Sequence, residues 1–302
     1  MIKLKKIAPY LSGIAFATIF GFSFLIVKNT LESVEIFQLL GLRFLTAAIV
    51  FELLRITKVI KINLKLKDLK IILPVAVFQP VLYFISEVYG IKNSATSEAG
   101  LFIGMIPVAV ALISWIFLKE KLNAKQTIFM VMSLAGVIFI SVMQLNGTIG
   151  TTKPIGYLFL VGAVISAAFY NMFSRKASSK HSSMEITYVM MLTGAVVFNC
   201  IGLIDSAIKD YSYFSPILSM ESVAAILYLG ILSSIVAFFF VNFTLSRMPA
   251  TQGSLFANLI TVISIIAGVV FLNEDFSIYK IIGSVLIIIG VWGANYFQKR
   301  DK

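Results

Sequence analysis

Polar side chains that interrupt long apolar stretches are the residues of this sequence most able to do chemistry. Gln79, Tyr83 and Glu87 follow one another at intervals of four residues, which places them on one face of a helix. Pro80 lies in the same stretch and predicts a kink that frees backbone groups for other partners. These side chains are therefore candidates for contact with a polar ligand.

Two acids lie within or beside apolar stretches, Glu87 and Glu98. A carboxyl group that takes up and releases a proton inside a membrane is what coupling to a proton gradient requires. Both acids lie near the ends of their stretches, where water can reach them, and Lys92 lies between them. A structural ion pair or a solvated rim is the alternative to a coupling role.

A second polar stripe lies in the later part of the chain. Thr251, Ser254 and Asn258 have the spacing of one helix face. Stripes of small, weakly polar residues are also common packing surfaces between membrane helices. Substrate contact and helix packing are both open for this stripe.

Other polar residues inside apolar stretches complete the set of candidate substrate contacts: Arg43, Ser166, Tyr170, Asn171 and Asn242. Asn242, and Gln252 with it, can hydrogen-bond between helices as easily as bind a ligand. Arg43 lies about halfway along its stretch, where it can attract an anionic group or extend to a helix end.

An enzyme, a metal site and a cofactor site are not expected. The sequence has one histidine, His181, and one cysteine, Cys200, too few for a transition-metal site built from these residue types. No clustered nucleophile and base is found, and no glycine-rich phosphate loop followed by lysine and serine or threonine. The net charge of +11 comes from short basic bursts between apolar runs, which suit membrane headgroups and not nucleic acid.

The elements that must position these residues are membrane-spanning helices. Hydrophobic residues make up 59% of the chain and charged residues 13%, with a mean hydropathy of +0.96. The apolar runs are continuous and not alternating, which predicts helices and excludes a barrel. Ten spans are expected, at 9–27, 35–54, 69–90, 96–118, 124–142, 155–174, 185–205, 222–246, 250–272 and 278–297.

Orientation follows from the basic residues of the connecting segments. Most lysine and arginine residues fall in the alternate segments that share a side with the N-terminus. The positive-inside rule then places both termini in the cytoplasm of a multi-pass cell-membrane protein, in the plasma or inner membrane.

The sequence contains an internal repeat. A shift of 154 residues, the spacing from Leu101 to Leu255, also aligns Glu120 with Glu274 and Gly136 with Gly290. The repeats are expected at 1–145 and 154–302. Each holds five spans, and because this number is odd, the second repeat must be inverted in the membrane. The predicted fold is therefore an all-α polytopic membrane protein whose ten transmembrane helices form two inverted five-helix repeats.

The pattern resembles the drug/metabolite transporter superfamily, and within it the ten-span EamA-type permeases. The residues that carry the resemblance are Phe20-Gly21-Phe22-Ser23-Phe24, Arg43-Phe44, Pro107, Trp115-Ile116-Phe117-Leu118-Lys119-Glu120, Gly136, Phe271-Leu272-Asn273-Glu274, Gly283 and Gly290. The resemblance covers essentially the whole chain, and the inverted repeat favours alternating access.

By this resemblance the function is expected to be secondary transport, with export or exchange of amino acids or related small metabolites. A channel, or a membrane sensor or assembly subunit that does not transport, is the alternative. The expected partners are a small-molecule substrate and the lipid bilayer, without nucleic acid. The fifth and tenth spans, apolar apart from glycines such as Gly136 and Gly290, are candidate scaffold or homodimer faces.

Overall fold

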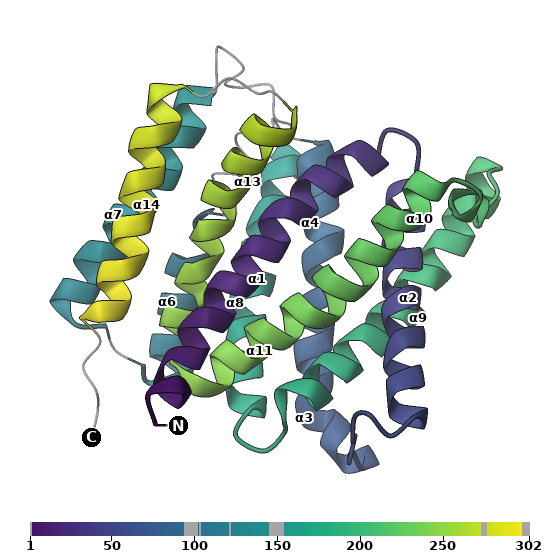
Figure 1. The fold of residues 1–302 in the computed structure, drawn as a ribbon, viewed down its shortest axis with the longest axis horizontal. Coiled ribbons are helices and arrows are strands. Elements are labelled where there is room, and N and C mark those ends of the chain that lie inside the picture. The colour runs from purple at the N-terminus through teal and green to yellow at the C-terminus, as the bar shows by residue number, and fades with distance from the viewer. Residues whose placement is uncertain are drawn as a thin grey trace. The chain divides into compact units, whose positions relative to one another are not determined.

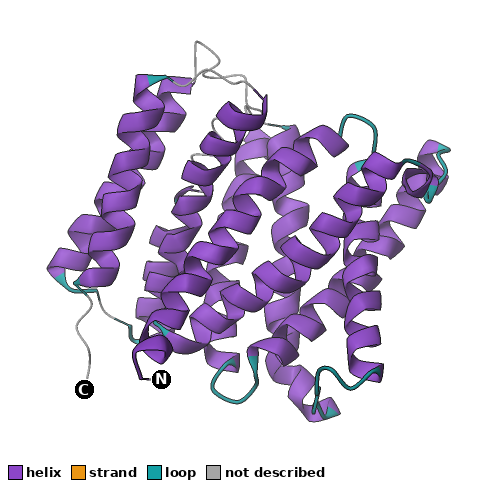
Figure 2. Ribbon diagram, in the orientation of Figure 1, coloured by secondary structure: helices purple, strands orange, loops and turns teal. Residues whose placement is uncertain are grey.

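The chain folds into helices joined by short connections. A computed structural model describes residues 2–93, 102, 104–120, 122–144, 154–272 and 277–297. Within these ranges every regular element is helical (Figure 2). Lipid offers the backbone no hydrogen-bond partners, so apolar runs of this length satisfy their own N–H and C=O groups as helices.

Nine helical segments of the described chain are long and apolar enough to cross a membrane: Ile7–Val27, Ile36–Ile56, Leu66–Gly90, Ala124–Met143, Pro154–Ala177, Ser183–Lys209, Met220–Arg247, Ala250–Phe271 and Ile278–Tyr296. A shorter apolar helix, α6 (Ile106–Leu118), lies where the fourth span is predicted. The first part of that predicted span, including Ser97 and Glu98, lies outside the described residues. The other nine predicted spans correspond to the nine long helices.

The helices form two compact units, each with segments from both halves of the sequence. One unit comprises Met1–Val81 and Phe173–Ser246, and the other Leu82–Met172 and Arg247–Lys302. The boundaries of the two compact units therefore differ from those of the two predicted sequence repeats. The division into repeats at 1–145 and 154–302 stays a sequence prediction.

The first unit is built on the pairing of α2 (Ile36–Ile56) with α9 (Ser183–Lys209), which lie side by side in Figure 1. The rings of Phe44 and Phe198 stack across this pair with centroids 5.4 Å apart. A Cβ atom at Gly194 would lie 2.7 Å from the Phe44 ring, so only glycine permits the approach. The same unit contains α1 (Ile2–Thr30), α3 (Leu66–Ala76), η2 (Ser215–Leu218), α10 (Met220–Leu227), η3 (Tyr228–Ala237) and α11 (Phe238–Arg247).

The second unit is built on the pairing of α7 (Ala124–Gln144) with α14 (Ile278–Tyr296), also side by side in Figure 1. A Cβ atom at Gly136 would lie 2.7 Å from the Gly283 carbonyl oxygen, and one at Gly290 would lie 2.5 Å from the Ser133 nitrogen. Small residues allow this close backbone packing in a membrane. The unit also contains α4 (Tyr83–Lys92), α6, most of α8 (Pro154–Ala177), α12 (Ala250–Gly253), η4 (Ser254–Phe256) and α13 (Ala257–Leu272).

The predicted kink at Pro80 is present, but it disrupts a predicted helix face. Gln79 has φ −149° and ψ 121°, an extended conformation inside η1 (Val77–Leu82), and the Gln79–Pro80 peptide bond is cis. The expectation that Gln79, Tyr83 and Glu87 share one face of a regular helix is therefore wrong for Gln79. Proline lacks the N–H that would continue the helix, so the backbone reorients at this point.

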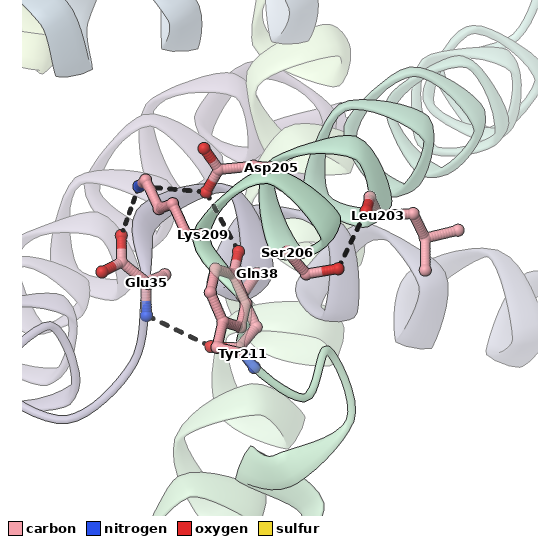
Figure 3. A network of polar contacts seen from close by, with 7 residues as sticks. All are labelled: Glu35, Gln38, Leu203, Asp205, Ser206, Lys209 and Tyr211. Atoms are coloured by element: carbon pink, nitrogen blue, oxygen red, sulfur yellow. Dashed lines mark hydrogen bonds and ion pairs between the residues drawn. The ribbon is translucent and has the colours of Figure 1, made fainter.

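A polar network ties the N-terminal end of α2 to the C-terminal end of α9 in the first unit (Figure 3). The Lys209 ammonium lies 2.9 Å from Glu35 and 3.1 Å from Asp205. Tyr211 donates a hydrogen bond of 3.0 Å to Asp205, and burial together with this bond raises the pKa of Tyr211 to about 12. Its hydroxyl therefore stays protonated, and a donor, across the physiological range. The network fixes the connection that follows α9.

Candidate functional site

Arg43 is a buried cation held by hydroxyl groups. It lies on α2 with only 4% of its surface exposed. Its Nε donates a hydrogen bond of 2.7 Å to Ser234 Oγ, and its Nη2 donates one of 2.9 Å to Ser233 Oγ. The guanidinium carbon lies 5.4 Å from the centroid of the neighbouring Phe44 ring. These contacts fix the orientation of a charge that is costly to remove from water.

The two serines belong to η3, a π-helical stretch between two α-helical segments. Such widened turns occur frequently at functional sites. Gly230 in the same stretch lets α2 approach, because a Cβ atom there would lie 2.8 Å from the Thr46 side chain and 2.9 Å from the Arg43 carbonyl oxygen. Local glycine and π-helical geometry thus position both hydroxyls against Arg43.

Asn242 links three helical segments within the first unit. It is completely buried on α11, accepts a hydrogen bond of 2.7 Å from Ser174 Oγ on α8, and donates one of 2.9 Å to Thr187 Oγ1 on α9. Its amide nitrogen also lies 3.4 Å from Met190 Sδ. Of the two alternatives open at the sequence level, these contacts favour hydrogen bonding between helices.

Tyr83 and Glu87 lie one helical turn apart on α4 and are hydrogen-bonded. The Tyr83 hydroxyl donates to Glu87 Oε1 at 2.8 Å. Tyr83 is buried and Glu87 is half-buried. The spacing argument thus holds for this pair. Gln79, half-buried beyond the break in the helix, does not continue their face.

Three polar side chains of α8 are buried in the second unit. Ser166, Tyr170 and Asn171 each have less than a tenth of their surface exposed. The Asn171 amide donates to the Ala167 carbonyl oxygen at 2.8 Å, within its own helix. This helical bond uses part of the donor capacity of Asn171.

The stripe that begins at Thr251 is buried and partly bonded within the second unit. Ser254 Oγ donates to the Thr251 carbonyl oxygen at 3.1 Å, and the Asn258 amide on α13 donates to Ser133 Oγ on α7 at 3.0 Å. The 3₁₀ turn η4 interrupts the α-helical spacing on which the stripe was predicted. The hydrogen bond to Ser133 favours helix packing as the role of Asn258.

Gln252 and Ser114 are the residues that sequence reasoning undervalued. Both are essentially fully buried, yet Gln252 Oε1 and Ser114 Oγ have no hydrogen-bond partner in the part of the chain that the structure describes. From the sequence, hydrogen bonding between helices and ligand binding were both open for Gln252. The signal that could have singled it out is the internal repeat, because a shift of 154 residues places Gln252 opposite Glu98.

Glu120 is hydrogen-bonded to Ser114 on α6 and to Thr251 on α12. Its backbone N–H donates to the Ser114 carbonyl oxygen at 3.2 Å, and its carboxylate accepts a long hydrogen bond of 3.4 Å from the Thr251 backbone N–H. The sequence predicts that Glu120 closes a turn between two spans. In the structure it also connects the end of α6 to the start of α12, whereas its repeat partner Glu274 lies outside the described residues.

No group of three or more His, Cys, Asp and Glu side chains that could hold a metal ion occurs within the described ranges. The first unit thus brings Arg43 together with two serines and buries Asn242 among three helices. The second unit holds the Tyr83–Glu87 pair, the α8 group and the stripe with Gln252.

Comparisons with known proteins agree with this architecture. The model of the EamA-like transporter family matches the chain twice, at residues 7–142 and 154–296. An uncharacterized transporter of Bacillus subtilis strain 168, YcxC, is 37% identical over 305 residues, covering 100% of this chain and 97% of that protein. A second from the same organism, YetK, is 25% identical and covers 95% of this chain and 87% of that protein.

Among the solved structures that are similar, a crystal structure of a protein has a TM-score of 0.78 and 20% sequence identity, covering 96% of this chain and 99% of that chain. At this identity the likeness supports the fold. The paired family matches, together with the spanning helices, make this a multi-pass membrane transporter with two repeats.

Proposed function

We infer that this chain, which belongs to the EamA-like transporter family, is a secondary carrier that exports or exchanges amino acids or related small metabolites by alternating access. Transport itself follows from the family and from relatives named as transporters. The two family repeats support alternating access, because paired repeats exchange conformations around a shared site in many carriers.

The observation that carries the substrate class is the buried guanidinium of Arg43. Arginine presents a planar array of donors that suits a carboxylate. Ser233 and Ser234 orient the group by 2.9 Å and 2.7 Å hydrogen bonds, so part of its donor set is fixed before a ligand arrives. A substrate with a carboxylate would gain a charge-assisted hydrogen bond at this position.

The remaining substrate contacts that we propose are polar residues within the spans: Gln79, Tyr83, Ser166, Tyr170, Asn171, Thr251 and Ser254. Asn242 and Asn258, which are candidates from the sequence, are assigned instead to hydrogen bonding between helices. Proton coupling is assigned to Glu87 or to Glu98. The hydrogen bond from Tyr83 to Glu87 supports the first choice, since it holds a titratable carboxyl within a span.

The proposed location is the plasma or inner membrane, with both termini in the cytoplasm. A homodimer through the fifth and tenth spans is part of the same proposal. Single cysteines placed at Asn63 and Ser179 test the orientation, because both should react with a membrane-impermeant maleimide only from the cytoplasmic side. Reaction of either from outside would contradict the inverted arrangement.

The test of function is uptake by the purified full chain in liposomes. Each of the twenty labelled amino acids is presented with and without an imposed pH gradient. Saturable uptake is expected for a subset, and its pH dependence should disappear in Glu87→Gln or in Glu98→Gln. Flux through folded protein that never saturates would indicate a channel, and no flux above that of empty liposomes would favour a sensor or assembly subunit.

A further inference from the structure

The helices α6 and α12 each carry a buried polar atom that has no hydrogen-bond partner among the described residues. The two helices pack against each other within the second unit. Ser114 lies on α6 with none of its surface exposed, and Gln252 lies on α12 with 1% exposed. Leaving a buried polar atom without a hydrogen bond is unfavourable, so each such atom in a native protein calls for a physical explanation, and a bound ligand group or water is one.

The polar atoms of Gln252 and Ser114 that have no partner within the described ranges can both accept hydrogen bonds. The Gln252 atom without a partner is its amide oxygen, which only accepts, and the Ser114 hydroxyl accepts through its lone pairs. Glu120 connects the two helices. Its carboxylate accepts a hydrogen bond from the Thr251 N–H next to Gln252, and its backbone N–H donates to the Ser114 carbonyl oxygen. A ligand group that suits this set is a donor, and a positively charged amine suits it best.

The internal repeat offers independent support. The position equivalent to Gln252 in the first repeat is Glu98, another side chain with an acceptor oxygen at its end. Helix packing alone does not demand an acceptor at this position in both repeats. A role in contacting a shared substrate explains why both repeats retain one.

Resting on the carrier function proposed above, we propose that Gln252 Oε1 and Ser114 Oγ, between α6 and α12, form a contact point that binds the amino group of the transported molecule. The point becomes accessible when α12 separates from α6 during the transport cycle. When the two helices separate, Gln252 Oε1 and Ser114 Oγ lose no hydrogen bond to the described residues. Both atoms can then bind water or the amine.

The chain offers a matched control in Asn295 on α14. Its amide oxygen is also buried without a partner among the described residues, in the same unit, but it belongs to the helix that packs against α7. Gln252→Met and Asn295→Leu each replace an amide by an apolar group of similar size. Ser114→Ala removes the second proposed contact with a minimal change of shape.

The experiment measures counterflow of an equimolar mixture of the twenty labelled amino acids into proteoliposomes containing the full chain. Unlabelled alanine, valine, leucine and phenylalanine compete in one series, and their 2-oxo acids, which lack the amine, compete in another. Thermal unfolding in detergent confirms that each variant is folded. We expect the wild type to be inhibited about tenfold more strongly by the amino acids than by the 2-oxo acids.

Gln252→Met should lower counterflow about tenfold and remove the preference for the amine, Ser114→Ala should weaken both, and Asn295→Leu should leave both unchanged. Wild-type counterflow with an unchanged preference in Gln252→Met would overturn this inference while leaving the carrier function intact. Equal loss in Asn295→Leu would also overturn it, as a general packing effect. Absence of counterflow in the folded wild type would overturn the proposed function and this inference together.

Discussion

The buried polar atoms of Arg43 and Asn242 in the first unit differ in their hydrogen bonding from those of α6 and α12 in the second unit. Arg43 and Asn242 donate or accept at 2.7–2.9 Å to side chains of other helices. Gln252 Oε1 and Ser114 Oγ, equally buried, have no such partners among the described residues. A bonded network stabilises one packing of helices, whereas unpaired groups favour an arrangement in which they find partners.

Arg43→Met is expected to have the largest effect. Transport should fall about 100-fold, equivalent to about 2.7 kcal/mol of lost substrate interaction, because the carboxylate loses its charged partner. Folding stability should also fall, by about 1–3 kcal/mol, because the buried hydroxyls of Ser233 and Ser234 lose the donor from which they accept. Counterflow rates and thermal unfolding in detergent check the two parts.

Arg43→Lys is the matched control, because it retains the charge without the planar donors. It should retain more transport than Arg43→Met. Transport by Arg43→Met at the wild-type rate would assign Arg43 to the packing of α2 against η3 and exclude it from substrate binding.

Asn242→Leu should weaken folding and leave the substrate dependence of transport unchanged. The substitution removes the acceptor of Ser174 and the donor to Thr187, which then remain buried without their amide partner. The expected cost is about 2–3 kcal/mol in the free energy of unfolding. Denaturant titration in detergent measures it, and a raised KM with undiminished stability would instead place Asn242 in the substrate path.

Gln252→Met should change stability in the opposite direction. Removal of an acceptor that has no partner among the described residues is expected to raise the free energy of unfolding by about 1 kcal/mol. The same titration gives the sign of the change directly. A loss as large as that of Asn242→Leu would show that Gln252 is bonded in the folded protein and would remove the contrast between the two regions.

Lys209→Met, in the network of Figure 3, should have the smallest effect. The side chains of Lys209 and Glu35 are about half exposed, so solvent and salt weaken their ion pair. The expected loss is at most about 0.5 kcal/mol, and it should shrink further in high salt. A larger loss that salt does not reduce would mean that this network constrains the helices as strongly as the Asn242 cluster does.

The sequence predicted the helices well because continuous apolar runs leave the backbone few alternatives in a membrane. It also predicted the kink at Pro80 and the shared helix face of Tyr83 and Glu87, which follow from local covalent geometry and helical spacing. Gln79 was misplaced because spacing rules assume an unbroken helix. The widened turns of η3 leave no clear local pattern, so the serines that bind Arg43 could not be found from the sequence.

The roles of individual polar residues were harder to predict for a different reason. Asn242 and Gln252 are both buried amides within apolar spans, and the sequence allowed either to bond between helices. Which of them finds partners depends on the residues that neighbouring helices present, and those contacts join positions far apart in the chain. The repeat alignment of Gln252 with Glu98 was the available hint.

The most direct test of the central claim is counterflow by the wild-type chain. Proteoliposomes are loaded with an unlabelled amino acid, and labelled amino acid is supplied outside at a low concentration. A carrier that alternates its access predicts a transient internal accumulation of label above the outside concentration, which vanishes when the internal load is omitted. Saturable entry without that overshoot, or simple equilibration that the internal load does not change, would contradict alternating access.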